Sequence, residues 1–414
     1  MALTARPLRW RRFAAVAGPG LVVMLADTDA GSVVTAAQSG ALWGYGLLAL
    51  QFVLIPVLYV VQELTVRLGI TTGRGHGHLI KAHFGAAWAW FSVGTLVLAC
   101  LGALLSELSG LAGAGELFGV PVKLTMGVVF AGLTAMAFTG SYRTVERIAM
   151  AFGALEIVFV LVAWLAHPDA GALLSGALEM PWHEPGYRYL VAANIGAVLM
   201  PWMVFFQQSS VVEKRLSRPD LAAARWDTAI GAVVTQLVMA GVLVATAASR
   251  GSGAHGVALE SVAQIAQAFT RVLGAQWGAV LFGLGLAGSA LVATIVVTLT
   301  AARSLSEVLG VRHSLEHSAR EAPWFYGLYT LCLGLGAVLV GSGINLVKVS
   351  VGVQVMNALL LPIVLGFLYL LARRLPPQER LRGGYAALVL VVIVATTALG
   401  VYAAVSGIVS GAGS

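Results

Sequence analysis

Length and composition exclude a soluble domain. The chain has 414 residues, of which 59% are hydrophobic and 10% are charged, whereas a soluble domain carries about 25% charged residues. The net charge of +7 does not indicate nucleic-acid binding, because the basic residues stand in short clusters between apolar segments, as membrane topology requires. The two cysteines, Cys100 and Cys332, lie inside apolar stretches and form neither a disulfide framework nor a zinc-binding spacing.

The chain begins with an arginine-rich segment and then an apolar run. The run continues past Asp27 and Asp29 without an obvious cleavage site, so we expect a retained membrane helix and not a signal peptide. Since a spanning helix needs roughly 20 mostly apolar residues, the sequence predicts about eleven spans. In chain order they are 14–39, 45–69, 87–113, 121–140, 145–166, 190–211, 228–249, 275–302, 323–341, 347–372 and 384–408.

The basic residues orient these spans. With a cytoplasmic N-terminus, most of the 25 lysines and arginines fall on the cytoplasmic side of the predicted topology. This asymmetry predicts a multi-pass protein of the cytoplasmic membrane, with its N-terminus inside and its C-terminus outside.

The first and sixth spans each contain a helix-breaking interruption. Residues 26–32 read Ala-Asp-Thr-Asp-Ala-Gly-Ser, and residues 197–203 read Ala-Val-Leu-Met-Pro-Trp-Met. Corresponding breaks in two halves of five spans are typical of transporters built from inverted repeats. The sequence therefore predicts an all-α membrane protein with one transporter domain. We expect its repeats at about 14–166 and 190–372, and an extra helix at about 384–408.

Asp27 and Asp29 are the strongest functional signal. A buried carboxylate at the bilayer centre is costly without a partner, and segment 14–39 contains no lysine or arginine. Residues two apart point about 200° away from each other on an intact helix, so both can face one cavity only if the backbone unwinds. A bound cation is the simplest partner. The alternative is structural, with one aspartate capping a half-helix and the other binding water. Ser32 is a further candidate ligand on the Asp29 face.

Polar and sulfur-containing side chains in other spans extend this candidate site. Met200 adjoins the proline break, and its thioether would favour softer divalent ions, although methionines in apolar runs usually fill the core. Gln354 and Asn357 share one face of the tenth span at i, i+3 spacing, where polar residues also hold helices together. Gln207 follows Met200 by one heptad and is expected on the same face.

The remaining intramembrane acids have two interpretations. Glu107 and Glu156 are candidates for proton relay. Glu63 has an arginine four residues on, which indicates a structural ion pair. His76 and His78 fall in an inner loop and are expected to be solvated.

These residues resemble the NRAMP divalent metal transporters, whose fold is of the LeuT type. The similarity is clearest from Gly18-Pro19-Gly20 through residues 36–41 to residues 67–73. It continues weakly through 118–121, the Met200-Pro201 break and the stretch that ends at Leu361-Pro362.

The resemblance implies a set of metal ligands. The family's first-helix motif, Asp-Pro-Gly-Asn, occurs here as residues 29–32, so Asp29 matches the ligand and Ser32 replaces the asparagine. In the sixth span Met200 matches the thioether ligand, and Ala197 matches a position that gives a backbone carbonyl. Gln354 matches a glutamine that approaches the metal.

Several departures from the family concern proton transfer. Trp202 and Gln207 replace two histidines, and Leu104 stands where the family has an aspartate, whereas Glu107 matches a family glutamate. Asp27 is an additional acid. Together these departures are similar to the NRAMP-related magnesium transporters, and they imply weak or absent proton coupling.

The sequence therefore predicts import of Mg²⁺ or Mn²⁺ by a protein that is not an enzyme. We expect no cofactor besides the transported ion, no nucleic-acid partner and no required protein partner. The alternatives are a proton-coupled Mn²⁺/Fe²⁺ symporter and, less favoured because two acids would repel a substrate carboxylate, a sodium-coupled amino-acid carrier. The expected metal ligands are Asp27, Asp29, Ser32, Ala197, Met200 and Gln354, and Glu107, Gln207 and Asn357 are expected in proton-relay or supporting positions.

Overall fold

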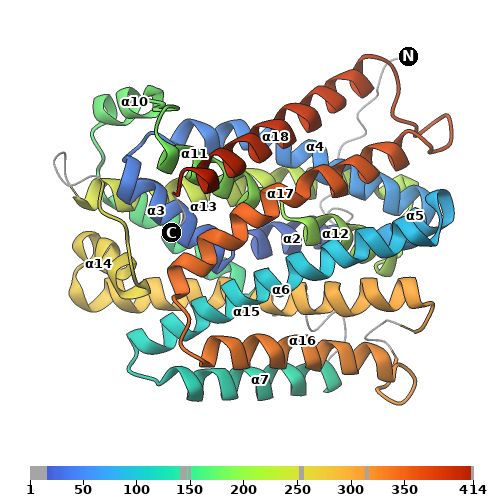
Figure 1. Cartoon of the computed structure of the whole chain (residues 1–414), viewed down its shortest axis with the longest axis horizontal. Helices are drawn as coiled ribbons and strands as arrows, with labels where there is room; N and C mark the ends of the chain where they lie inside the picture. Colours follow the sequence, from blue (N-terminus) through green and yellow to red (C-terminus); the bar gives the residue numbers. More distant parts are fainter. Residues whose placement is uncertain (1–15, 140–146, 148–150, 251–255, 313–316, 412–414) are drawn as a thin grey trace.

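The computed structural model describes residues 16–139, 147, 151–250, 256–312 and 317–411, and within these ranges the regular elements are helices. The long helices run along a common direction (Figure 1). In chain order the elements are α2 Pro19–Asp27, α3 Ala30–Trp43, α4 Leu48–Thr72, α5 His76–Phe84, α6 Ala86–Leu117, α7 Val122–Thr139, η1 Ala154–Glu156, α9 Ile157–Leu165, α10 Ala170–Leu178, α11 Pro185–Val198, α12 Pro201–Glu213, η2 Arg218–Asp220, α13 Leu221–Arg250, α14 Val262–Leu273, α15 Ala275–Leu309, α16 Pro323–Gly341, α17 Leu346–Ala372 and α18 Gly383–Val409.

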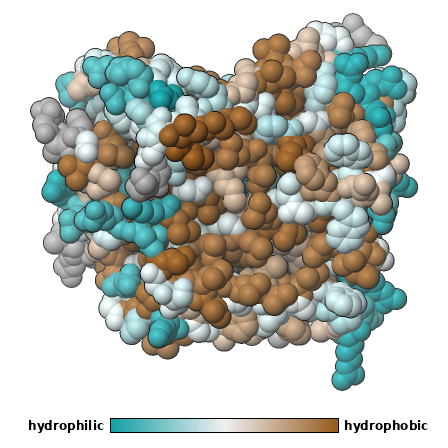
Figure 2. All heavy atoms as spheres, viewed as in Figure 1, coloured by the Kyte–Doolittle hydropathy of each residue, from teal (hydrophilic) through white to brown (hydrophobic). Residues whose placement is uncertain are grey.

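Most of the eleven expected membrane spans correspond to long apolar helices of the described chain. Eight of the described helices are long and apolar enough to cross a membrane, or up to ten spans if each of two bent helix pairs counts as one. The bend is 48° between α2 and α3, and 107° between Ala151–Leu165 and α10. Val122–Phe138 is a shorter apolar helix, and the beginning of the expected span 145–166 lies outside the described residues. Hydrophobic residues cover the middle of the face in Figure 2, while hydrophilic residues gather toward its two ends.

Three short helices occupy segments that we expected to be loops. α10 and α14 lie at the end of the bundle where α18 finishes, and α5 lies at the opposite end (Figure 1). The prediction that His76 is solvated is wrong, because α5 packs against α12. The His76 ring is buried edge-on against Phe205, with 4.7 Å between ring centroids, and its Nδ1 lies 3.0 Å from Gln208 Oε1.

The two broken spans, α2–α3 and α11–α12, lie inside the bundle. α13 packs on α2, α3 and α4, α6 packs on α15 and α17, and α11 packs on α17 and α18. Two glycines permit the closest approach. A Cβ on Gly196 would lie 1.8 Å from the carbonyl oxygen of Gln354, and a Cβ on Gly31 would lie 2.1 Å from Gln354 Nε2. α17 therefore rests directly against both broken spans.

Ion pairs connect the helices at the end that carries α5. Glu63 Oε1 lies 2.7 Å from Arg67, which confirms the expected i, i+4 pair, and also 2.7 Å from Arg225 of α13. Glu213 of α12 pairs with Arg303 of α15 at 2.7 Å. Because such buried groups are costly when one partner is lost, these pairs hold α4 against α13 and α12 against α15 at this end.

Candidate metal centre

The first break places two aspartates at opposite ends of a short unwound segment. α2 ends at Asp27 and α3 begins at Ala30. Asp29 is the N-cap of α3, and its Oδ1 accepts a 2.6 Å hydrogen bond from Ser32 N. An aspartate is favoured there because the first turn of a helix leaves N–H groups unpaired. The local sequence therefore starts a new helix in the middle of the span.

Glu107 of α6 is a second carboxylate at the start of α3. Its Oε2 accepts a 3.0 Å hydrogen bond from Ala30 N, and its carboxyl group interacts with that of Asp29. The partial positive charge of a helix N-terminus favours both acids. Asp29 Oδ2 and Glu107 Oε1 have no hydrogen-bond partner among the described residues.

The second break meets the first. α11 ends at Val198 and α12 begins at Pro201, whose missing N–H costs nothing at the first helical position. The last carbonyls of a helix have no partner within it. One of these, the Ala197 carbonyl, accepts a 3.1 Å hydrogen bond from Ser32 Oγ. This bond joins the two unwound segments.

Met200 lies at the second break with its sulfur already oriented. The Trp202 indole Nε1 donates a hydrogen bond to Met200 Sδ at 3.1 Å, and both side chains are buried. A thioether sulfur has two lone pairs, so one stays available to a metal ion. The residue that replaces a family histidine therefore contacts the adjacent candidate ligand.

Gln354 and Asn357 come from α17, which lies against both breaks. Asn357 Nδ2 donates to Gln354 Oε1 at 2.9 Å. Gln354 Nε2 and Asn357 Oδ1 are buried without hydrogen-bond partners in the described parts of the chain, as is Ser106 Oγ beside Gly31. The amide of Gln354 thus lies next to the N-terminal turn of α3.

Asp27 and Glu156 form the other half of the acidic cluster. Asp27 is 1% exposed, and neither of its carboxylate oxygens has a hydrogen-bond partner within the described residues. It interacts electrostatically with Asp29 and Glu156. Glu156, in η1, accepts a hydrogen bond from Thr28 Oγ1. The sequence identified Glu156 only as an intramembrane acid, and the tertiary structure brings it to the first break.

Gln207 forms hydrogen bonds with side chains of two other helices. Its Oε1 accepts a 2.5 Å hydrogen bond from Thr65 Oγ1, and its Nε2 donates to Thr228 Oγ1 at 3.0 Å. Gln207 therefore ties α4, α12 and α13 together. In the described part of the chain, no three His, Cys, Asp or Glu side chains converge well enough to hold a metal ion by themselves. An ion at the breaks must also take neutral oxygens or the sulfur.

The four acids at the first break are buried inside the bundle. A cavity of about 540 Å³ between α3, α11 and α17 lies at one end, and another of about 350 Å³ beside Glu213, Arg303 and Glu307 lies at the other. None of the four acids at the first break lines either cavity. At the first cavity Gln38 exchanges two hydrogen bonds, of 2.5 and 3.0 Å, with the backbone of Leu259.

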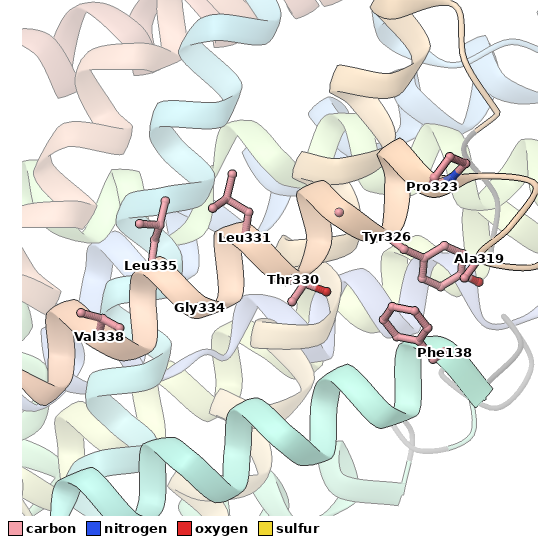
Figure 3. A pocket seen from close by; sticks show the side chains of 10 residues that line it. Phe138, Ala319, Pro323, Tyr326, Thr330, Leu331, Gly334, Leu335 and Val338 are labelled. Atoms are coloured by element: carbon pink, nitrogen blue, oxygen red, sulfur yellow. The ribbon is translucent and has the colours of Figure 1, made fainter.

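A cavity of about 790 Å³ between α7 and α16 is unrelated to the acids. Figure 3 shows that its lining is mostly apolar, with the Phe138 ring of α7 next to the Tyr326 ring of α16 at a centroid distance of 4.9 Å. It lies on the outer helix pair and has the composition of a lipid-facing surface.

A family model described as "Natural resistance-associated macrophage protein-like" (Nramp) matches residues 20–406. The chain belongs to the Nramp family. Nramp proteins are membrane transporters and not enzymes, so the prediction of a non-enzymatic multi-pass protein is confirmed.

Curated Nramp relatives match most of the chain. The divalent metal cation transporter MntH of Bradyrhizobium diazoefficiens is 28% identical over 319 residues, which cover 72% of this chain and 69% of the relative. MntH of Chromohalobacter salexigens is 27% identical over 380 residues, which cover 88% and 84%.

Solved structures confirm the LeuT-type fold. The Eremococcus coleocola manganese transporter, in complex with an aromatic bis-isothiourea substituted compound, gives a TM-score of 0.80 at 18% identity, covering 99% of this chain and 90% of that one. Mhp1, a nucleobase-cation-symport-1 family transporter, gives 0.62 at 15% identity, covering 95% and 91%.

Sequence reasoning missed one structural acid of this Nramp chain. Asp227 of α13 is 1% exposed and accepts hydrogen bonds from Gly20 N at 2.7 Å and from Gly18 N at 3.3 Å. It thus caps the N-terminus of α2 from a distant helix. The only signal in the sequence was an acid at the edge of the apolar segment 228–249.

Proposed function

We propose that this Nramp chain imports a small divalent cation, Mg²⁺ or Mn²⁺, through the two helix breaks. The observation that carries the proposal is the hydrogen bond from Ser32 Oγ to Ala197 O, because it joins the breaks beside the Asp29 carboxylate. Broken helices expose carbonyl oxygens at the middle of a membrane, where transporters of this architecture bind cations.

We assign the ion to the space that Asp29, Ser32, Ala197 and Met200 border. Asp29 Oδ2 is a buried oxygen without a hydrogen-bond partner among the described residues, and it carries the negative charge that a cation needs. Ser32 Oγ and Ala197 O add hard oxygens, and Met200 Sδ adds one soft donor. Glu107 supports this position, because it accepts a hydrogen bond from Ala30 N at the same helix N-terminus that Asp29 caps.

Gln354 joins this set of metal ligands if its side-chain amide is rotated by half a turn. A half-turn of the Gln354 and Asn357 amides would direct Gln354 Oε1 toward Gly31 and Ser106 Oγ. Gln354 Nε2 would then donate to Asn357 Oδ1. The bond from Asn357 Nδ2 to Gln354 Oε1 would be replaced by the bond from Gln354 Nε2, and Gln354 Oε1 would be released as an oxygen ligand for a cation. Asn357 then orients the glutamine ligand.

The donor set favours Mg²⁺ and Mn²⁺ over softer ions. Carboxylate, hydroxyl and carbonyl oxygens suit Mg²⁺ and Mn²⁺, whereas a thioether suits softer metals. The curated relatives are named divalent metal cation transporters, and one similar structure is a manganese transporter. The oxygen-rich site, with Ser32 in place of the family's asparagine, supports placing this chain near the magnesium-transporting branch. We also propose that the N-terminus lies on the cytoplasmic side of the membrane.

Substitution of Asp29 tests the proposed site. In proteoliposomes, Asp29→Ala should lower uptake of Mg²⁺ and Mn²⁺ by at least about tenfold, because even supporting residues of metal sites contribute that much. The two ions should also compete in the wild type. Glu179→Gln, at an exposed acid of the α10 end, is the matched control and should transport normally. Wild-type uptake by a correctly folded Asp29→Ala protein would refute the assignment.

A further inference from the structure

The four acids at the first break experience two different electrostatic environments. Asp29 and Glu107 accept hydrogen bonds from backbone N–H groups at the N-terminus of α3, where the helix dipole favours negative charge. Asp27 is the last residue of α2. A helix C-terminus carries partial negative charge, so the dipole of α2 opposes the charge on Asp27.

Among the described residues, no basic side chain forms an ion pair with Asp27 or Glu156. The charged groups that act on them are Asp29 and, for Asp27, Glu156 itself, all of the same sign. The ion pairs between described residues do not include either acid. Both side chains are 1% exposed, and three of their four carboxylate oxygens lack a hydrogen-bond partner among the described residues. Burial of such charges is costly unless a cation is present.

We propose that Asp27, Glu156 and the Thr28 hydroxyl form a second cation site, separate from that of the divalent substrate, which holds a monovalent alkali cation of the sodium class. Thr28 Oγ1 donates to Glu156 and lies 2.8 Å from the carbonyl oxygen of Leu25, so its lone pairs remain free to ligate. The ion would connect the end of α2 to η1. This second site rests on the proposed function only because the divalent ion is placed at Asp29.

Burial is the first reason to assign a monovalent ion. The available ligands are all oxygens, which alkali ions accept. Mg²⁺ dehydrates reluctantly and usually keeps several waters, whereas Asp27 and Glu156 are buried and line none of the cavities beside the bundle ends. An ion that sheds its water readily suits this position better.

Repulsion between ions is the second reason. Two residues of extended chain span at most about 7 Å, so an ion at Asp27 lies close to one at Asp29. Coulomb repulsion scales with the product of the charges. A divalent ion at both positions would therefore repel twice as strongly as a divalent and a monovalent ion.

Radioactive Na⁺ binding to the purified transporter, in the absence of divalent ions, tests the site. The wild type should bind Na⁺, and Glu156→Gln and Asp27→Asn should each lower the affinity by at least about 100-fold, as expected for removing one partner of a buried charge pair. Thr28→Ser should bind Na⁺ more tightly than Thr28→Val. Glu179→Gln should match the wild type. Size-exclusion profiles check that each variant is folded.

The Asp29→Ala variant separates this site from the proposed function. It should lose divalent uptake but keep Na⁺ binding, and with equal Na⁺ on both sides of the membrane Na⁺ should accelerate wild-type divalent uptake. Na⁺ binding by a wild type that transports no divalent ion would support this site and refute the proposed function. Absence of Na⁺ binding in the wild type, or unchanged binding in Glu156→Gln, would overturn the second site. Displacement of Na⁺ from Asp29→Ala by low concentrations of Mg²⁺ would overturn its monovalent character.

Discussion

A tryptophan in place of a family histidine changes the chemistry around the candidate ligand Met200. The Trp202 indole can only donate a hydrogen bond, and it donates to the Met200 sulfur. This contact orients the thioether without adding a titratable group. The substitution therefore preserves a soft ligand while removing a proton acceptor from the same turn.

Met200→Ala should change ion preference more than total uptake. Loss of the thioether should weaken Mn²⁺ binding by about tenfold and leave Mg²⁺ nearly unchanged, because sulfur contributes little to a hard ion. Trp202→Phe, which keeps Met200 but removes the indole donor, should shift Mn²⁺ affinity less. The measurement is competition between the two ions for uptake into proteoliposomes. Equal losses for both ions in Met200→Ala would show that this side chain only packs.

At the scale of helices, the first half of the broken span is held by another helix. Some helices of this chain are capped by a residue next to them in the sequence, as Asp169 caps α10 through a 2.7 Å bond to Ala172 N. α2 instead has no local side-chain cap, and Asp227 of α13 accepts its N-terminal N–H groups. This contact fixes α2 to α13 and so fixes where the break lies.

Asp227→Ala should therefore destabilise the protein more than Asp169→Ala. Removing a buried acceptor leaves N–H groups unpaired and costs about 1–3 kcal/mol, whereas water can replace the exposed cap. Thermal unfolding in detergent, followed by size-exclusion chromatography, would show a lower midpoint for Asp227→Ala and little change for Asp169→Ala. If the two variants had equal midpoints, α2 would not depend on its distant cap.

At the scale of the whole molecule, transport requires both ends to open in turn. Gln38 and Leu259 close the end beside α14 through two hydrogen bonds, and the Glu213–Arg303 pair ties helices together at the other end. Two buried polar side chains toward the end that carries α5 are poor proton carriers. Gln207 is held by two threonines. Burial lowers the pKa of His76 to about 4, which keeps its ring neutral at physiological pH.

We therefore expect divalent uptake with little accompanying proton flux. With Na⁺ equal on both sides, the membrane potential supplies about 2.3 kcal/mol per charge per 100 mV, or about 4.6 kcal/mol for a divalent ion. Proteoliposomes with an internal pH dye and an imposed negative potential measure both fluxes. The lumen should stay near its starting pH while metal enters. Acidification that follows metal entry and disappears in Glu107→Gln would contradict this expectation.

The sequence by itself determined the spans, the two breaks and the local contacts. Apolar run length, Pro201 and the Asp29 capping position act within a few residues, so they are readable without knowledge of neighbours. The Glu63–Arg67 pair, four residues apart, is of the same kind. These features also carried the family resemblance that the comparisons confirmed.

Only the tertiary structure decided which distant side chains meet at the breaks. Glu107 reaches Ala30 across 77 positions, and Glu156 reaches Thr28 across 128. Spanning helices that are apolar on every side have no periodic pattern to mark the face that turns inward. Close glycine contacts and polar bonds between helices set that rotation, and they form only when α6, η1 and α17 pack around the broken span.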